Sequence, residues 1–168
     1  MRPGMCSAYI SGVRRCMGAV VVCVVLTACG GSDAASAPTG RIAVRSPAFA
    51  NGQPIPAAYT CTGKEISPPL NWSGVPKGTT SLKLDMNDLS AHFVHWKVRG
   101  IDPGVTSVAA GTVPKGGKQG RNSFNKVGYG GPCPPPGDNP HRYAFTITAL
   151  GTHGKVLDRG SLVGTFSR

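Results

Sequence analysis

HRYAFTITAL, residues 141–150, is the clearest strand signal in the chain. Aromatic and aliphatic side chains recur at every second residue, so they share one face of an extended strand, and His141 lies on that face by the same period. The opposite face is polar. The apolar face holds Tyr143, Phe145 and Ile147, and the polar face holds Arg142, Thr146 and Thr148.

Other segments repeat this short alternating pattern, whereas apolar residues at helical spacing are scarce. The run 81–86 places two leucines and a methionine on one face, and a further strand begins at 42–44. The run 93–99 also alternates, which predicts His95 and Trp96 on opposite faces.

Turn-forming residues are abundant between these runs. The chain of 168 residues contains 24 glycines and 15 prolines, many of them in the loops 100–120 and 128–140. Short strands joined by such loops predict a mainly β domain, and long loops in a compact domain often carry function.

The N-terminal segment resembles a bacterial lipoprotein signal. Three arginines are the only charges before Cys29, and an apolar run, 17–26, is too short to span a bilayer comfortably. LTAC, residues 26–29, then resembles the lipobox, in which the cysteine sulfur receives diacylglycerol. A secretory signal cut by ordinary signal peptidase and a short uncleaved anchor are the alternatives.

This interpretation divides the chain into three parts. We expect a signal peptide at 1–28, a lipidated flexible tether at 29–39 and one folded domain at 40–168. Lipid on Cys29 would hold the domain at the extracytoplasmic face of the cell membrane, since several acyl chains anchor a protein stably.

The composition limits the partners and the cysteine chemistry. Lys and Arg number 18 against 7 Asp and Glu, but the basic residues are scattered and no nucleic-acid motif is present, so the charge favours anionic envelope surfaces or lipids. Outside the signal peptide and Cys29, two cysteines remain, Cys61 and Cys133, which favours one disulfide in an oxidising compartment. A redox or metal-binding thiol pair is the alternative, without the C-x-x-C or Cys/His spacing that would support it.

Three polar side chains recur beside the expected strands: Asp88 after one, His95 within the next and His141 at the start of another. Taken singly, Asp88 could cap a turn and His95 could be a satisfied strand histidine. Their joint occurrence with GYGGPCPPPG, residues 128–137, favours a binding site, because histidines and the backbone N–H groups of a glycine-rich loop can donate to an anion.

Together these motifs resemble the phosphatidylethanolamine-binding proteins, with closer similarity to their bacterial Raf kinase inhibitor-like branch. The resemblance covers 42–168 and rests on the order and spacing of five motifs. They are SPPLNW at 67–72, Asp88, the pair His95-Trp96, the loop 128–137 and the HRY motif at 141–143.

The resemblance implies a β-sandwich of antiparallel strands with few short helices and a small pocket at one end. Such pockets bind phosphate, acetate or a phospholipid head group, with the histidines and the backbone near Gly131 as donors and Asp88 orienting a histidine. No cofactor, metal or catalytic residue is implied. The expected pocket residues are Asp88, His95, Gly131, Pro132, His141 and Tyr143.

Two features depart from the family pattern. The acidic loop usually reads D-P-D-A-P, whereas residues 88–91 keep only the first acid and the alanine. The helical segment that commonly follows the HRY strand is also missing before the C-terminal run, which suggests less cover beside the pocket.

Three functions are compatible with these residues. The first is a lipid-anchored module that binds small anions or phospholipid head groups. The second is an inhibitor or modulator of an envelope protein such as a protease or a signalling protein, although no feature identifies that partner. An enzyme that uses Asp88 and the histidines ranks third, because neither a nucleophile elbow nor a metal-ligand cluster is present.

Overall fold

A computed structural model describes residues 42–168. The predicted signal peptide at 1–28, the lipidated Cys29 and the tether at 29–39 lie outside the described residues. Within 42–168, no helix is long and apolar enough to cross a membrane.

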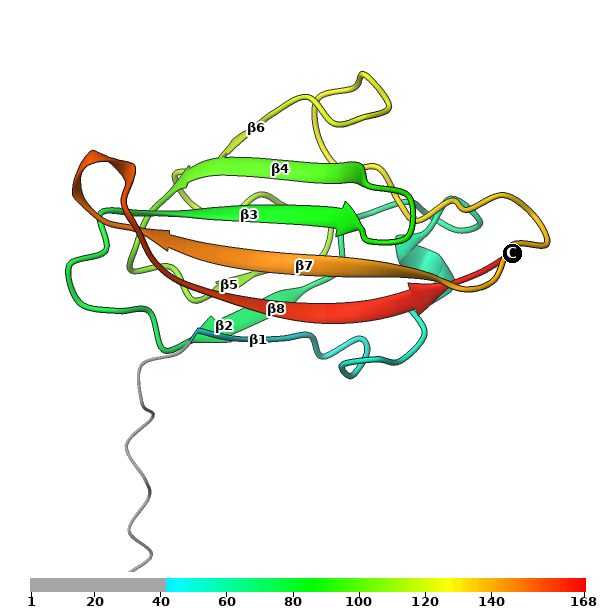
Figure 1. Cartoon of the computed structure of the whole chain (residues 1–168), viewed down its shortest axis with the longest axis horizontal. Coiled ribbons are helices and arrows are strands. Elements are labelled where there is room, and N and C mark those ends of the chain that lie inside the picture. The colour runs from blue at the N-terminus through cyan, green and yellow to red at the C-terminus, as the bar shows by residue number, and fades with distance from the viewer. Residues whose placement is uncertain (1–41) are drawn as a thin grey trace, which may run out of the picture. The chain divides into compact units, whose positions relative to one another are not determined.

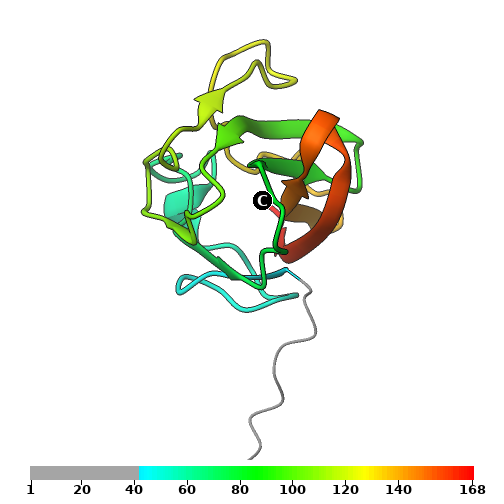
Figure 2. The ribbon, with the colours of Figure 1, turned by 90° about the vertical axis from the view of Figure 1, so that its left-hand side faces the viewer.

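The described chain forms two antiparallel sheets around one hydrophobic core (Figures 1 and 2). The larger sheet has the strand order β6-β4-β3-β7-β8, and the smaller has the order β1-β2-β5. The strands are β1 (Ala43–Arg45), β2 (Leu70–Ser73), β3 (Ser81–Asp88), β4 (Phe93–Ile101), β5 (Ser107–Val108), β6 (Lys118–Gln119), β7 (His141–Leu150) and β8 (Val156–Phe166). The prediction of a mainly β fold with antiparallel strands is confirmed.

Helical structure is limited to two single turns of 3-10 helix in this part of the chain, η1 (Ala57–Tyr59) and η2 (Thr152–Gly154). The connection between β7 and β8 contains only η2. This agrees with the expectation that the longer helical segment common in the family is absent here.

Strand β3 shows how the core leads into the polar end of the domain. Leu82, Leu84 and Met86 are fully buried on its inner face. The strand continues two residues beyond the predicted run, so the same period of two places Asp88 on the inner face, where it is 4% exposed. A carboxylate therefore terminates a row of apolar side chains.

Strand β7 lies beside β3 and repeats this arrangement. The inner row of His141, Tyr143, Phe145 and Ile147 agrees with the predicted apolar face. On the outer face Thr148 is also buried, because its sheet neighbours Lys83 and Arg159 flank it with long side chains.

The predicted alternation along 93–99 is wrong at one point. Met86 pairs with Trp96 and the next residue, Asn87, pairs with Val94, so His95 is the extra residue of a β-bulge. The bulge shifts the phase of β4 by one residue. His95 and Trp96 are consequently both buried, and His95 points inward near Asp88.

Strand β8 has 11 residues and was not among the expected strands. Its inner face alternates Gly160, Leu162 and Gly164, so the two glycines conceal the apolar period. Gly160 lies directly against the carbonyl group of Ile42, where the two sheets meet.

We expect Gly160→Ala to destabilise the fold. A Cβ at this position would overlap the backbone carbonyl oxygen of Ile42, so a strand must shift, at a cost of about 1–3 kcal/mol in the free energy of unfolding. Denaturant unfolding measures this change. Gly120→Ala is the matched control, because its Cβ would meet Lys97 Cβ at an ordinary 3.5 Å, and equal stability of the two variants would contradict the described packing.

Candidate functional site

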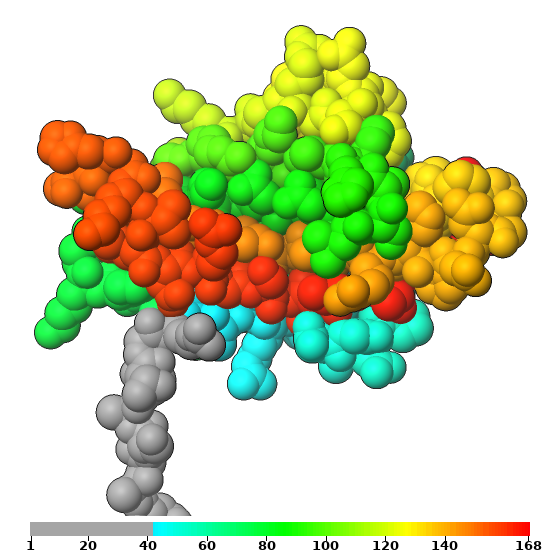
Figure 3. Space-filling model, viewed as in Figure 1, coloured from blue at the N-terminus to red at the C-terminus, as the bar shows by residue number. Residues whose placement is uncertain are grey.

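Four of the predicted pocket residues meet in one small cavity at the end of the larger sheet. Asp88, His95, His141 and Tyr143 line a pocket of about 140 Å³. The rest of the lining consists of Ala91, Phe93, Phe124 and the run Cys133, Pro134 and Pro135. Figure 1 shows this end on the right, where β3 ends and β7 begins, and Figure 3 shows the adjoining loop before β7, in amber, projecting there.

Asp88 links the turn after β3 to the start of β7. One carboxylate oxygen, Oδ2, lies 2.7 Å from His141 Nδ1. The other, Oδ1, accepts hydrogen bonds from the N–H groups of Ser90 (2.8 Å) and Ala91 (3.2 Å). Asp88 therefore caps a turn and orients a histidine at the same time.

The contact with Asp88 sets the charge of His141. The hydrogen bond from the imidazole to the Asp88 carboxylate raises the pKa of His141 above its ordinary value, although partial desolvation opposes this. Asp138 adds a weaker contribution from the rim, with its Oδ2 3.4 Å from His141 Nε2. His141 is thus a candidate cation in the pocket at mildly acidic pH.

His95 has a different environment. Its ring lies in edge-on contact with the rings of Phe93, Phe124 and Tyr143, each with a centroid separation of 5.2 Å. Its Nδ1 is 2.9 Å from the carbonyl oxygen of Gly130. Burial lowers the pKa of His95, so this ring is held neutral where His141 is charged.

The hydroxyl group of Tyr143 is an unsatisfied polar atom. Tyr143 is fully buried, and its hydroxyl makes no hydrogen bond of ordinary length within residues 42–168, although the Asp88 carboxylate and the Cys133 backbone lie near enough to influence its ionisation. Burial raises the pKa of Tyr143, and so does the nearby Asp88 carboxylate, so the group keeps its proton. A buried hydroxyl without a partner is costly and rare, so the Tyr143 hydroxyl is a candidate donor to a ligand or a water.

The other two predicted residues, Gly131 and Pro132, are buried beside the pocket but are not part of its lining. The Gly131 N–H donates to Glu65 Oε1 (3.1 Å), and the Pro132 carbonyl accepts from the Cys61 N–H (3.1 Å). These backbone groups face the segment before β2, and Gly131 approaches Thr60 so closely that a Cβ would be crowded.

The predicted disulfide between Cys61 and Cys133 is present in the structure. It fastens the loop before β7 to the same segment, so Cys133 and the prolines after it form a fixed wall of the pocket.

Several residues of the site were not predicted. Glu65 and Phe124 lie in loops without a recognisable motif. Arg168 donates from Nε to the Pro134 carbonyl (2.5 Å), and its own carbonyl accepts from the Gly137 N–H (3.0 Å). These contacts depend on how distant loops meet, for which the local sequence holds no signal.

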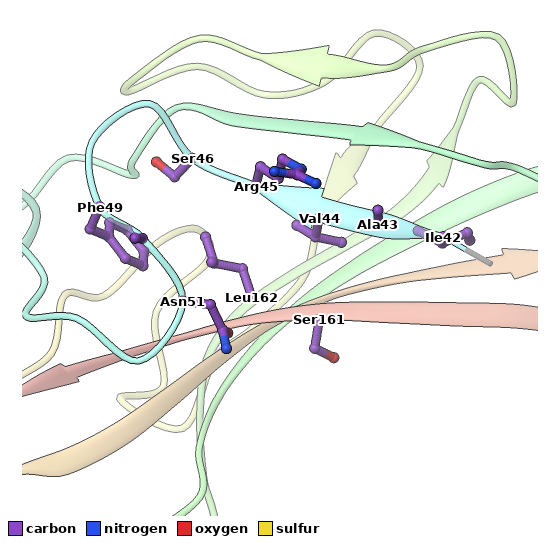
Figure 4. Close-up of a pocket in the computed structure, with 10 residues that line it drawn as sticks. Ile42, Ala43, Val44, Arg45, Ser46, Phe49, Asn51, Ser161 and Leu162 are labelled. Atoms are coloured by element: carbon purple, nitrogen blue, oxygen red, sulfur yellow. The ribbon is translucent and has the colours of Figure 1, made fainter. Parts of the chain in front are cut away.

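A larger hollow of about 510 Å³ lies between β1, the segment after it and β8 (Figure 4). Its buried side chains are apolar, namely Ile42, Val44, Phe49 and Leu162. Arg45 is its one ionisable side chain among the described residues. The converging titratable groups are found in the smaller pocket, which is therefore the candidate site.

Comparison with known proteins identifies relatives of the whole domain. The family profile described as phosphatidylethanolamine-binding protein matches residues 45–166. A UPF0098 protein from Aquifex aeolicus is 40% identical over 151 residues, which are 74% of this chain and 88% of that protein. The candidate lipoprotein LppC from Mycobacterium tuberculosis is 45% identical over 112 residues, 65% of this chain and 55% of LppC, so the match spans about half of that relative.

Two solved structures share the fold. The candidate phosphatidylethanolamine-binding protein homologue CT736 from Chlamydia trachomatis superposes with a TM-score of 0.69 at 32% identity, over 77% of this chain and 99% of that one. YbcL from E. coli, described as a member of the mammalian PEBP family, has a TM-score of 0.69 at 28% identity, over 76% and 99% of the two chains.

We expect Asp88→Asn to lower the pKa of His141. The variant removes the charge that favours the imidazolium, whereas Asp138→Asn, the control, removes only the weaker rim contribution and should produce a smaller decrease. NMR titration of the histidine ring protons measures both. An unchanged His141 pKa in Asp88→Asn would show that this contact does not set the charge.

Proposed function

Because the chain belongs to the phosphatidylethanolamine-binding protein family, we propose that its small pocket binds an oxyanion, either free or as the phosphate of a phospholipid head group. The observation that carries this proposal is the buried Tyr143 hydroxyl, which has no partner in the described chain and lies in a pocket with His141. Tyr143 O–H and the His141 imidazolium are donors of the kind that bind oxyanions.

Further charge favours an anion. Arg168 lies close enough to Tyr143 to influence its ionisation, and its contacts with the loop hold it near the pocket. The negative charge of Asp88 is offset by His141 and two backbone N–H groups, which leaves less of it to oppose a ligand.

The volume of the pocket limits what enters. About 140 Å³ is below the roughly 300–1,000 Å³ of pockets that enclose drug-sized ligands. A phosphate or carboxylate group has about the right size, whereas an acyl chain would have to remain outside. A lipid would therefore be bound by its head group alone.

The chemistry of the lining favours binding over turnover. Cys133 is oxidised in the disulfide and Tyr143 retains its proton, so neither supplies an activated nucleophile. His95 and Asp88 are both held by backbone contacts, which suits a rigid receptor for an anion.

We also propose that lipid on Cys29 holds the domain at the extracytoplasmic face of the membrane. The LTAC motif at 26–29 supports this, as does the description of LppC as a candidate lipoprotein. The tether at 29–39 would then keep the pocket within reach of phospholipid head groups.

Removing the Tyr143 hydroxyl should weaken phosphate binding. A hydrogen bond to a charged group contributes about 1.5–3 kcal/mol, so Tyr143→Phe should raise the Kd by about 10- to 100-fold. Isothermal titration with inorganic phosphate at pH 6, where His141 carries its proton, measures the change. Tyr59→Phe is the control, because its hydroxyl lies outside the lining, and equal affinities of the two variants would refute the role of Tyr143.

Replacing Cys29 should release the protein from the membrane. Cys29→Ala removes the thiol that receives diacylglycerol, so the protein should move from the membrane fraction to the soluble fraction of cells. Mass spectrometry of the wild-type N-terminus should show the lipid. Wild-type protein that is free of lipid, or a variant that stays in the membrane fraction, would contradict the anchor.

A further inference from the structure

The hydrogen bonds of His95 determine which of its ring nitrogens carries a proton. A carbonyl oxygen can only accept, so His95 Nδ1, at 2.9 Å from the Gly130 oxygen, must be the donor. The Gly130 N–H donates in return to the His95 carbonyl (3.0 Å). This reciprocal pair of bonds fixes the orientation of the ring and its tautomer.

The second ring nitrogen of His95 is left for the pocket. Nε2 has no hydrogen bond within the described part of the chain, and the ring lines the cavity. In a neutral imidazole with its proton on Nδ1, Nε2 carries a lone pair and is an acceptor. This differs from the sequence-based expectation, in which both histidines donate to the ligand.

The surroundings of His95 keep the ring neutral. Three aromatic side chains contact it. Burial lowers its pKa more than the hydrogen bond to the Gly130 backbone, a contact with the Gly131 backbone and its charged neighbours raise it. Those neighbours are Asp88 at the end of β3 and Glu65 before β2. His141 and Tyr143, which face it from β7, are themselves donors.

We propose that the pocket selects an oxyanion that carries a proton of its own, such as hydrogen phosphate or a phosphomonoester, over fully ionised sulfate and over phosphodiesters. This inference rests on the proposed function. His141 and Tyr143 donate to the charged oxygens of the ligand, and the ligand's P–OH donates to His95 Nε2. A ligand without O–H places an oxygen lone pair against that nitrogen, or it must first protonate a buried ring.

Selection of this kind is strong for a physical reason. A site with a buried acceptor rejects an analogue that lacks the matching donor, because the acceptor is then desolvated without a partner. Sulfate and phosphate have nearly the same size and geometry. A difference in affinity between them therefore reports the effect of the proton that phosphate carries and sulfate lacks. Many lipid head groups are diesters without P–OH, whereas phosphatidic acid is a monoester.

Titration calorimetry on the purified protein tests the proposal at pH 6, near the second pKa of a phosphomonoester, about 6. The probes are inorganic phosphate, phosphoethanolamine, sulfate and the diester glycerophosphoethanolamine. We expect the first two to bind at least about tenfold more tightly than the last two. Vesicles with phosphatidic acid, compared with phosphatidylglycerol vesicles of equal charge, show whether the preferred monoester is reached on a lipid as well as in solution.

His95→Asn provides the matched variant, because its amide can donate to the Gly130 carbonyl in place of Nδ1 but has no group at the position of Nε2. This variant should weaken phosphate binding and leave sulfate binding nearly unchanged. The ratio of the Kd for sulfate to the Kd for phosphate should therefore fall towards one. The ¹⁵N shifts of His95 in the wild type report the tautomer independently of how well the variant folds.

The outcomes separate the two proposals. Equal affinity for phosphate, sulfate and the diester, or a proton on Nε2 in the neutral ring, would overturn the selection and leave oxyanion binding intact. Absence of binding by all four probes would overturn the proposed function as well.

Discussion

The buried carboxylate of Asp88 is the constraint on which the site depends. A charged group at the end of an apolar row is tolerated only when its oxygens are paired. Asp88 meets this condition with His141 from β7 and two N–H groups of the turn after β3. Those contacts join the end of β3 to the start of β7. The Asp88 carboxylate, which would destabilise the core if it were unpaired, therefore fixes the positions of the polar groups that surround it.

The inward orientations of His141 and His95 depend on different kinds of structural information. His141 and Tyr143 continue the period of two along β7, and Asp88 continues that of β3, so a local pattern was sufficient to place them on the inner face. His95 is inward because β4 gains one residue against β3, and such a bulge is a property of the pairing of two strands. The sequence of β4 alone predicts His95 and Trp96 on opposite faces, whereas the bulge leaves both buried. Strand β8 was missed for a simpler reason, since glycines occupy the inner positions where side chains would have revealed its period.

The family resemblance named four residues that line one cavity in the structure, but it did not predict the directions of the hydrogen bonds there. Backbone N–H groups near Gly131 were expected to donate to a ligand, but in the structure the Gly131 N–H donates to Glu65, and the run from Cys133 to Pro135 forms the wall of the pocket. Likewise, a histidine in a motif is equally compatible with a donor and an acceptor. Only the position of the Gly130 carbonyl distinguishes the two for His95. Residue identity is local, whereas hydrogen-bond direction depends on loops that meet across the fold.

The disulfide adds a consequence of another kind. Cys133 is both a pocket residue and one end of the bond to Cys61, 72 residues earlier. A newly made chain in a reducing compartment has free thiols, and there the proline wall is attached only by non-covalent contacts. Disulfide formation therefore adds a covalent attachment between this wall and the segment before β2, and in the reduced chain the wall has more freedom to move.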